Sequence, residues 1–293
     1  MEFYVREDSN KANRLSPLTS CLSVCKPYKY KATCAKQLTQ LRLMNPLFIY
    51  RKDINMCLSV FVYFLLSLML LLPLHANASC HPTPDPQQAQ YLIGYGSLIQ
   101  TQSKQKTDSS SGPNRPVRVY GYHRGWFAKG TEVGYSTTYL AVSPQAGDHF
   151  NGTLFQLNQA DSINNYDARE KYYCRVAVDP NSIHPLTQEK PPKAQFWIYV
   201  IKPNLIAPPS EKFPLVQSYV DIFLSGCLEI ENKFKLKGFA AECVKTTSNW
   251  SVYWINDRLY PRRPFVCEPK AGQIDELLKR QIPRLFKQIA LNN

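Results

Sequence analysis

The chain of 293 residues has room for one large domain or two small ones. Hydrophobic residues make up 44% and charged residues 19%, which excludes a mainly disordered or fibrous protein. The formal net charge is +13, but the basic residues are scattered, and Arg258, Arg262 and Arg263 form their only compact cluster. Such scatter is typical of a solvated surface, so we expect no nucleic-acid partner.

The N-terminal third contains the pattern of a targeting signal. Residues 57–74 form an uncharged apolar run that follows Arg51 and Lys52, and Ala76 and Ala78 come soon after it. A basic segment, an apolar run and small residues before the cut are the parts of a signal peptide. We therefore expect cleavage after Ala78; an uncleaved membrane anchor is the alternative.

This pattern divides the chain into four parts. Residues 1–55 are an N-terminal extension or a start-site artefact, and residues 56–78 are the signal peptide or anchor. A Pro-rich spacer covers residues 79–90, and residues 91–293 form the main domain. We expect that domain to be exported, periplasmic or secreted, and to meet a membrane only through the N-terminal segment if that segment is not cleaved.

The cysteines after the expected cut are odd in number, so at least one is free or pairs between chains. They are Cys80, Cys174, Cys227, Cys243 and Cys267. Their pairing cannot be deduced from the sequence. No CxxC follows residue 78, no HExxH occurs, and the histidines are widely spaced, so we expect no metal site.

A series of β-rich runs follows the spacer. Tyr91–Tyr95 is predicted to be a short strand that leads into a glycine turn, and the polar residues 101–116 are predicted to be a flexible loop. Further strands are predicted at 117–126, 136–142, 152–157, 172–178 and 194–201. Strands followed by helices favour an α+β fold over a doubly wound sheet.

Asn158 is predicted to cap the first of three helices. Ile163, Tyr166 and Glu170 follow at a spacing that puts them on one helical face, which should be the buried one.

Two more helices are predicted towards the C-terminus. Leu215–Ser225 is the second, with Gly226 as the glycine that ends it. Gln273–Ala290 is the third, and Pro283 is expected to kink or split it.

The glycine turn at residues 94–98 is the first candidate for chemistry. A strand that runs into such a turn exposes backbone N–H groups, which can hold a carboxylate or a carbonyl oxygen. The turn is neither a GxSxG elbow, because Tyr95 and Ile99 replace the glycines around Ser97, nor a GxGxxG loop. Taken alone, it is more often an ordinary strand-end turn.

Glu170 is the second candidate. Burial and the helix C-terminal end would both raise the pKa of its carboxyl group, towards the range of a general acid or base. The alternative is a solvated carboxylate that pairs with Lys171 or Arg169. The spacing does not decide between the two.

Several short motifs, in this order and at these separations, resemble the γ-glutamylcyclotransferase-like family. They cover roughly residues 91–285. They are Tyr95-Gly96-Ser97-Leu98, Gly152-Thr153-Leu154-Phe155, Asp167-Ala168-Arg169-Glu170, the segment Pro214–Gly226 with Ser218-Tyr219, Asn256-Asp257-Arg258 and Pro261-Arg262-Arg263-Pro264.

The resemblance implies a fold, a reaction and a site. The fold is α+β, a small mixed β-barrel with flanking helices, and the reaction closes a γ-glutamyl group to 5-oxoproline without a cofactor. The backbone of Tyr95, Gly96, Ser97 and Leu98 would bind this small-molecule substrate, Glu170 would transfer the proton and Tyr219 would line the pocket. Two features depart from the family: Leu98 stands where many members have Asn, and export differs from the cytosolic members that degrade glutathione.

Three alternatives remain open. The first is a related enzyme of the same fold that acts on γ-glutamylamines or on a peptide, and the second is a catalytically silent binding module of that fold. The third is a serine hydrolase that uses Ser97, which would need a histidine and an acid beside it. His123, His149 and His184 lie in strand or loop contexts that suggest no such triad.

Overall fold

The computed structural model describes residues 80–130, 137–159, 161–189, 192–262 and 268–291. The expected extension, the signal peptide or anchor, and Cys267 lie outside these residues. Among the helices of the described part, none is long and apolar enough to cross a membrane.

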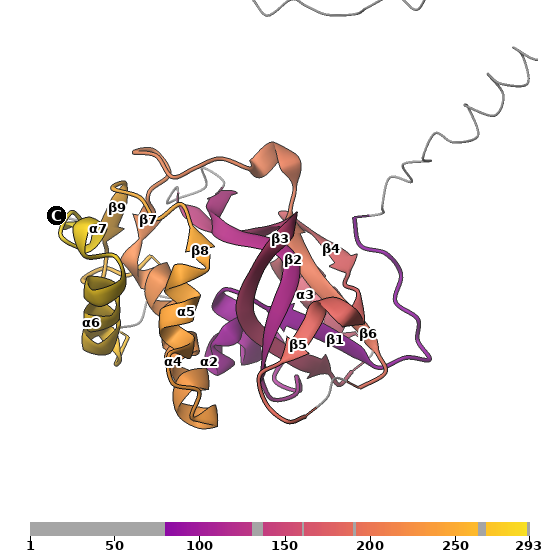
Figure 1. Ribbon diagram of the computed structural model, residues 1–293. Helices are drawn as coiled ribbons and strands as arrows, with labels where there is room; N and C mark the ends of the chain where they lie inside the picture. Colours follow the sequence, from indigo (N-terminus) through magenta and orange to yellow (C-terminus); the bar gives the residue numbers. More distant parts are fainter. Residues whose placement is uncertain (1–79, 131–136, 160, 190–191, 263–267, 292–293) are drawn as a thin grey trace, which may run out of the picture. The chain divides into compact units, whose positions relative to one another are not determined.

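A mixed sheet forms the centre of the described domain (Figure 1). Its strands are β1 (Gln90–Gly94), β2 (Arg115–Lys129), β3 (Thr138–Leu157), β4 (Tyr173–Ala177), β5 (Ile183–Pro185), β6 (Gln195–Ile201) and β8 (Thr247–Ser248). The order is β4-β6-β1-β3-β2-β5, and β8 pairs with β2. The β1–β6 and β2–β8 pairs are parallel and the others antiparallel.

The α+β class is confirmed, whereas the barrel is not. Among the described residues the pairing runs from β4 to β5 as an open path, with no pair that joins the two ends.

Helices lie on both faces of this sheet. On one face α3 (Ser162–Arg169) packs against Leu92 of β1. On the other face Ile93 contributes to a larger core with α4 (Gln217–Phe234), α5 (Phe239–Lys245) and α6 (Ala271–Gln281). Because successive strand residues point to opposite faces, a strand buried on both sides is apolar at every position, as Tyr91–Gly94 is.

The remaining elements are short. They are α2 (Thr101–Gln105), α7 (Pro283–Phe286), the 3-10 turns η1 (Ser97–Ile99), η2 (Pro180–Ser182) and η3 (Pro203–Leu205), and a second small sheet of β7 (Leu215–Val216), β9 (Trp254–Asn256) and β10 (Ala290–Leu291).

The predicted strands at 136–142 and 152–157 are parts of the one long strand β3, which has 20 residues. The polar residues between them hide this continuity, because they do not alternate with apolar ones. Residues 145–148 leave the ladder there, since Tyr120 pairs with His149 while Tyr122 pairs with Pro144.

The predicted end of the second helix at Gly226 is wrong. Helix α4 continues to Phe234, and Lys235 ends it in the left-handed conformation at φ 55°. Gly226 serves a close contact instead, since a Cβ there would lie 2.6 Å from the backbone nitrogen of Gln100.

The predicted start of the first helix at Asn158 is also wrong. Asp161 is the residue before α3, and the Asn158 side chain donates to the carbonyl of Ser110. Ile163 and Tyr166 are buried as predicted, but Glu170 is the residue that follows the helix rather than part of it. The residue before the helix is therefore Asp161 rather than Asn158, and the helix ends just before Glu170.

Pro283 splits the third helix as predicted, since α6 ends at Gln281 and α7 begins at Pro283. The predicted loop at 101–116 instead contains α2 and a buried lysine. The Lys104 ammonium donates to the Gly112 carbonyl and the Asn114 side chain, which holds the segment against the domain.

Two disulfides lie within the described domain. Cys80 pairs with Cys174 of β4, and Cys227 of α4 pairs with Cys243 of α5. The first attaches the start of the Pro-rich spacer to the sheet, 94 residues away in sequence.

Candidate functional site

The turn after β1 is held in place from both sides. Gly94 lies so close to β3 that a Cβ there would come 2.9 Å from the Thr153 hydroxyl oxygen, and a Cβ on Gly152 would come 2.5 Å from the Gly94 carbonyl oxygen. Leu98 and Ile99 of η1 are buried and anchor the far side of the turn. The Ile99 amide donates to the Gly96 carbonyl at 3.0 Å, and the amides before it precede the first hydrogen bond of the turn.

All six residues predicted from the sequence line one cavity of ≈ 20 Å³. They are Tyr95, Gly96, Ser97, Leu98, Glu170 and Tyr219. Sequence reasoning missed three further lining residues, Leu140 of β3, Tyr173 of β4 and Tyr199 of β6. No local pattern marks these three, because strand pairing over long sequence distances brings them to the cavity.

The carboxyl group of Glu170 is largely withdrawn from water, with 18% of its side chain exposed. Burial raises the pKa of this carboxyl group, and the charge of Arg169 opposes the rise. The Arg169 Nε lies 3.2 Å from Glu170 Oε1. The carboxyl group is thus paired with Arg169, as the alternative interpretation expected, but it is not solvated, and it lines the cavity.

Arg169 connects this carboxyl group to the turn. Its Nη2 donates to the Ser97 hydroxyl at 2.9 Å and to the Ser103 hydroxyl at 3.0 Å. Its Nη1 donates to the Thr107 hydroxyl at 2.6 Å. Arg169 therefore holds the Glu170 carboxyl group next to the turn.

Three buried tyrosines form the wall of the cavity. The Tyr95 hydroxyl donates to the Tyr199 carbonyl at 2.8 Å, and the Tyr173 hydroxyl donates to the Leu140 carbonyl at 2.9 Å. The Tyr199 hydroxyl donates to Asp167 Oδ1 at 2.6 Å. Burial raises the pKa of all three hydroxyls, so they remain neutral and keep the wall fixed.

Tyr219 approaches the turn from α4. Its ring packs edge-on against Trp126 and Tyr139, with centroids 5.9 and 5.1 Å apart. Its hydroxyl lies 3.5 Å from the position that a Cβ on Gly96 would take, and it is hydrogen-bonded to Ser97. Burial raises the pKa of the Tyr219 hydroxyl as well, so the group is a neutral donor beside the turn.

Asp167 has a structural position one helical turn before Glu170. Its Oδ1 accepts from Arg175 Nε at 2.9 Å, and the Arg175 side chain is 2% exposed. The same carboxylate holds Tyr199 in the cavity wall. Asp167 therefore neutralises a buried arginine.

No protein-family model matches the chain, and no curated protein matches it. Solved structures do. An uncharacterised human protein is 20% identical, with a TM-score of 0.39 over 52% of this chain and 88% of its own. A γ-glutamyl cyclotransferase is 15% identical, with a TM-score of 0.43 over 64% and 98%. A yeast γ-glutamyl cyclotransferase specific to glutathione is 10% identical, with a TM-score of 0.34 over 54% and 97%.

The chain is thus similar to γ-glutamylcyclotransferase-like proteins, as its motifs predict.

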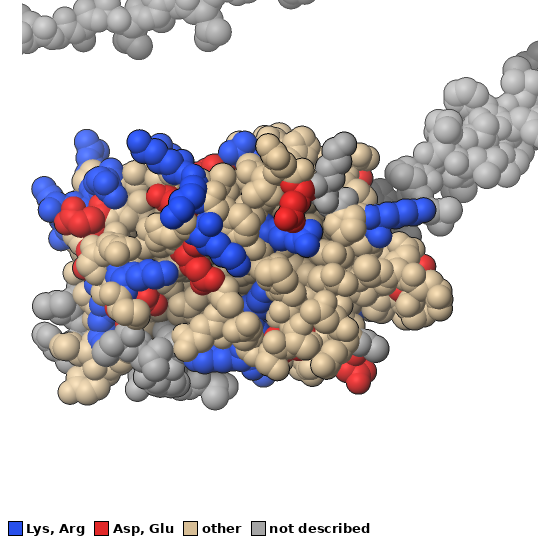
Figure 2. Space-filling view, turned by 90° about the horizontal axis from the view of Figure 1, so that it is seen from below, with Lys and Arg blue, Asp and Glu red and all other residues tan. Residues whose placement is uncertain are grey.

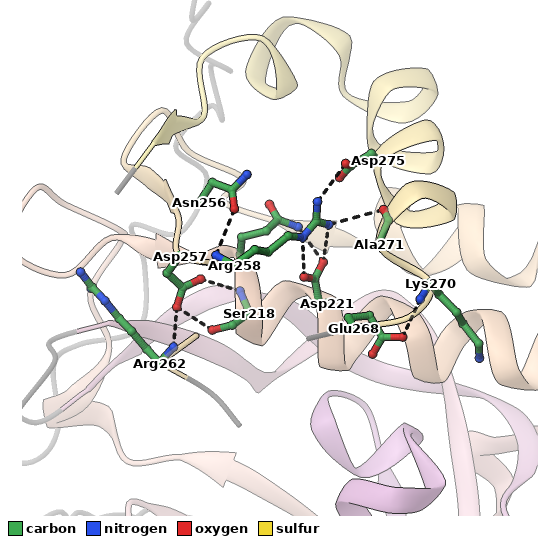
Figure 3. A network of polar contacts seen from close by, with 11 residues as sticks. Ser218, Asp221, Asn256, Asp257, Arg258, Arg262, Glu268, Lys270, Ala271 and Asp275 are labelled. Atoms are coloured by element: carbon green, nitrogen blue, oxygen red, sulfur yellow. Dashed lines mark hydrogen bonds and ion pairs between the residues drawn. The ribbon is translucent and has the colours of Figure 1, made fainter. Parts of the chain in front are cut away.

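The C-terminal motif forms a charged network beside the start of α4 (Figure 3). Asp257 accepts from the amide and the hydroxyl of Ser218, both at 2.7 Å, and from the Arg262 amide at 2.8 Å. Arg258 bridges Asp221 at 2.7 Å and Asp275 at 2.8 Å. Since Ser218 and Asp221 flank Tyr219 on α4, the network fixes the helix that brings Tyr219 to the cavity.

The geometry around Ser97 lacks the histidine of a serine hydrolase. Its hydroxyl contacts Arg169 and Tyr219, and among the described residues that line the cavity there is no histidine.

The charged surface is mixed rather than basic on the face that Figure 2 shows. Lysine and arginine side chains there are interspersed with acidic and uncharged ones. This distribution agrees with a solvated surface. Within the described residues, no three His, Cys, Asp or Glu side chains come together as a metal site.

Proposed function

We propose that the protein closes the γ-glutamyl group of a small molecule to 5-oxoproline and releases an amine or amino acid. Glu170 is the general acid and base, and the backbone of residues 95–98 binds the γ-glutamyl group. One observation carries the proposal: the carboxyl group of Glu170, whose pKa is raised by burial, lines the same cavity as the turn at residues 95–98. No cofactor is required for this reaction.

The chemistry needs no protein nucleophile, because the substrate supplies its own. Glu170 takes a proton from the α-ammonium group, and the free amine attacks the γ-carbonyl carbon. The turn amides stabilise the oxyanion that forms. The bond to the leaving nitrogen then breaks as Glu170 returns the proton to that nitrogen, and the ring nitrogen passes its second proton to the released amine, which leaves as an ammonium ion. Holding the substrate in a folded pose supplies the proximity effect.

The cavity of ≈ 20 Å³ has space for about one water molecule. We therefore expect the substrate to displace side chains when it binds. Tyr219 is the wall residue best suited to move, since it is half-buried while Tyr95, Tyr173 and Tyr199 are buried and hydrogen-bonded to backbone or to Asp167.

The experiment is incubation of the purified protein with a panel of γ-glutamyl peptides, γ-glutamylamines and glutathione, with 5-oxoproline as the readout. Release from at least one member supports the proposal, and the most rapidly cleaved member identifies the leaving group. Binding of a γ-glutamyl compound without release of 5-oxoproline would instead identify a silent binding module.

We also propose that the domain is exported. Two disulfides within the described residues support an oxidising compartment. N-terminal sequencing of the mature protein is expected to begin at Ser79. A sequence that begins at or before Leu74 would favour the anchor instead.

A further inference from the structure

Outside the cavity described above, three side chains from β2, β3 and β8 form a hydrogen-bonded line. His123 of β2 lies between Asp148 of β3 and Ser248 of β8. The His123 Nδ1 is 2.7 Å from Asp148 Oδ2, and the His123 Nε2 is 2.6 Å from the Ser248 hydroxyl oxygen. The serine and the histidine are 125 residues apart in sequence.

The proton positions in this line follow from the chemistry of the groups. An ionised carboxylate only accepts, so the His123 Nδ1–H donates to Asp148. In the neutral form of the ring, Nε2 then carries a lone pair that can accept from the Ser248 hydroxyl. This is the arrangement of nucleophile, base and orienting acid in serine hydrolases, which is recognised by geometry and roles rather than by sequence order.

The break in the β2–β3 ladder determines the position of Asp148. Residues 145–148 leave the ladder, and Gly147 there has φ 87°. Bulges of this kind bend a strand and redirect a side chain. As a result, Asp148 turns back onto the ring of His123.

Gly125 makes room for the serine. It pairs with Ser248 across the parallel β2–β8 contact, and a Cβ on it would lie 2.2 Å from the Ser248 hydroxyl oxygen. The His123 ring stacks on Phe127, with centroids 6.0 Å apart and the planes inclined by 11°. Gly125 and the Phe127 ring thus hold Ser248 and His123 within hydrogen-bonding distance of each other.

We propose that Ser248 is the nucleophile of a second site, which cleaves carboxylic esters with a small acyl group. The Ser248 oxygen attacks the ester carbonyl carbon while its proton passes to His123 Nε2. The bond to the alcohol oxygen breaks, and the alcohol leaves with that proton. Water then attacks the acyl-serine by the same route, which frees the acid and restores Ser248.

The three side chains are accessible from solution. The side chain of His123 is 30% exposed and that of Asp148 is 39% exposed, and Ser248 is half-buried. A small ester in solution therefore reaches Ser248 directly. The two sites share no residue.

The test uses the purified full chain and two probes, a fluorophosphonate and p-nitrophenyl acetate. We expect the fluorophosphonate to label Ser248, as located by peptide mass mapping, and p-nitrophenyl acetate to be hydrolysed. Ser248→Ala should abolish both signals. His123→Gln should slow both by ~10²–10⁴-fold, the scale of lost general-base help, and Asp148→Asn should slow both by a smaller factor.

Ser109→Ala is the matched control, because Ser109 is an exposed serine elsewhere on the domain. It should leave the labelling and the hydrolysis at the wild-type rate. Circular dichroism of each variant separates loss of the site from loss of the fold. The proposal is overturned if the folded wild-type chain is not labelled at Ser248, or if a folded His123→Gln variant is labelled at the wild-type rate.

Discussion

The ionisation of Glu170 depends on two opposing neighbours. Burial disfavours its charged form, whereas the guanidinium of Arg169 at 3.2 Å favours it. The balance is a raised pKa, which makes the carboxylate a better proton acceptor than a solvated one. The same arginine binds Ser97, so the proton carrier and the binding turn are held by one side chain.

The role of Glu170 leads to the first prediction. Glu170→Gln keeps the shape of the side chain and its contact with Arg169 but removes the transferable proton, so we expect 5-oxoproline release to slow by ~10²–10⁴-fold. Glu276→Gln, at an exposed position on α6, is the matched control and should retain full turnover. Near-normal release by Glu170→Gln would remove Glu170 from the mechanism.

The raised pKa of Glu170 also predicts how stability depends on pH. A carboxyl group whose pKa is higher in the folded state than its ordinary 4.5 favours folding most when it is protonated, and this contribution is lost as pH rises through the folded-state pKa. Glu170→Gln does not titrate. Its free energy of unfolding relative to the wild type should therefore increase from about pH 4 to about pH 7 in urea titrations. A difference independent of pH would show that the carboxyl group has an ordinary pKa.

Gly96 and Ser97 make different contributions to the turn. A Cβ on Gly96 would meet Tyr219 and Leu140 at 3.5 and 3.6 Å, so the two methyl groups of Gly96→Val would fill the cavity. We expect that variant to lose substrate binding, while Ser97→Ala, which removes one hydroxyl, should have a milder effect on KM. Full activity in Gly96→Val together with complete loss in Ser97→Ala would favour a nucleophilic serine.

At the scale of elements, the sequence predicted well where one local signal decides the structure. Pro283 splits a helix because it lacks an amide hydrogen, and the apolar run of β1 is a strand buried on both faces. Gly226 shows the limit, because a glycine that ends a helix and a glycine that allows close packing look the same in sequence. The line of Ser248, His123 and Asp148 shows it further, since only the folded sheet brings these positions together.

The packing role of Gly226 predicts the effect of adding one methyl group. Alanine favours a helix by ~1 kcal/mol over glycine. The new Cβ, however, would lie 2.6 Å from the Gln100 nitrogen, and relieving this contact requires the backbone to move. We expect Gly226→Ala to lower the free energy of unfolding by ~1–3 kcal/mol. Gly272→Ala in α6 is the control, since nothing lies within 4 Å of its added Cβ, and it should be neutral or stabilising by up to about 1 kcal/mol. Equal effects in the two variants would contradict the packing role.

At the scale of the whole described domain, the Cys80–Cys174 bond ties the start of the domain to the strand that carries Tyr173. The bond closes a loop across 94 residues of sequence, and cross-links over long loops remove much conformational freedom from the unfolded chain. The next residue, His81, reaches Asp167 at 3.9 Å. The disulfide therefore holds the start of the domain close to the ion pair of Asp167 and Arg175.

Removing this disulfide should lower stability strongly. We expect the double variant Cys80→Ala/Cys174→Ala to lose ~2–5 kcal/mol of unfolding free energy, measured by urea titration without reductant. Because the bond acts mainly on the unfolded chain in this account, the folded cavity should remain, and 5-oxoproline release at temperatures well below the unfolding midpoint should persist. Wild-type protein titrated with reductant provides the comparison, and its midpoint should also fall. An unchanged urea midpoint in the double variant would mean that the Cys80–Cys174 bond is absent from the protein in solution.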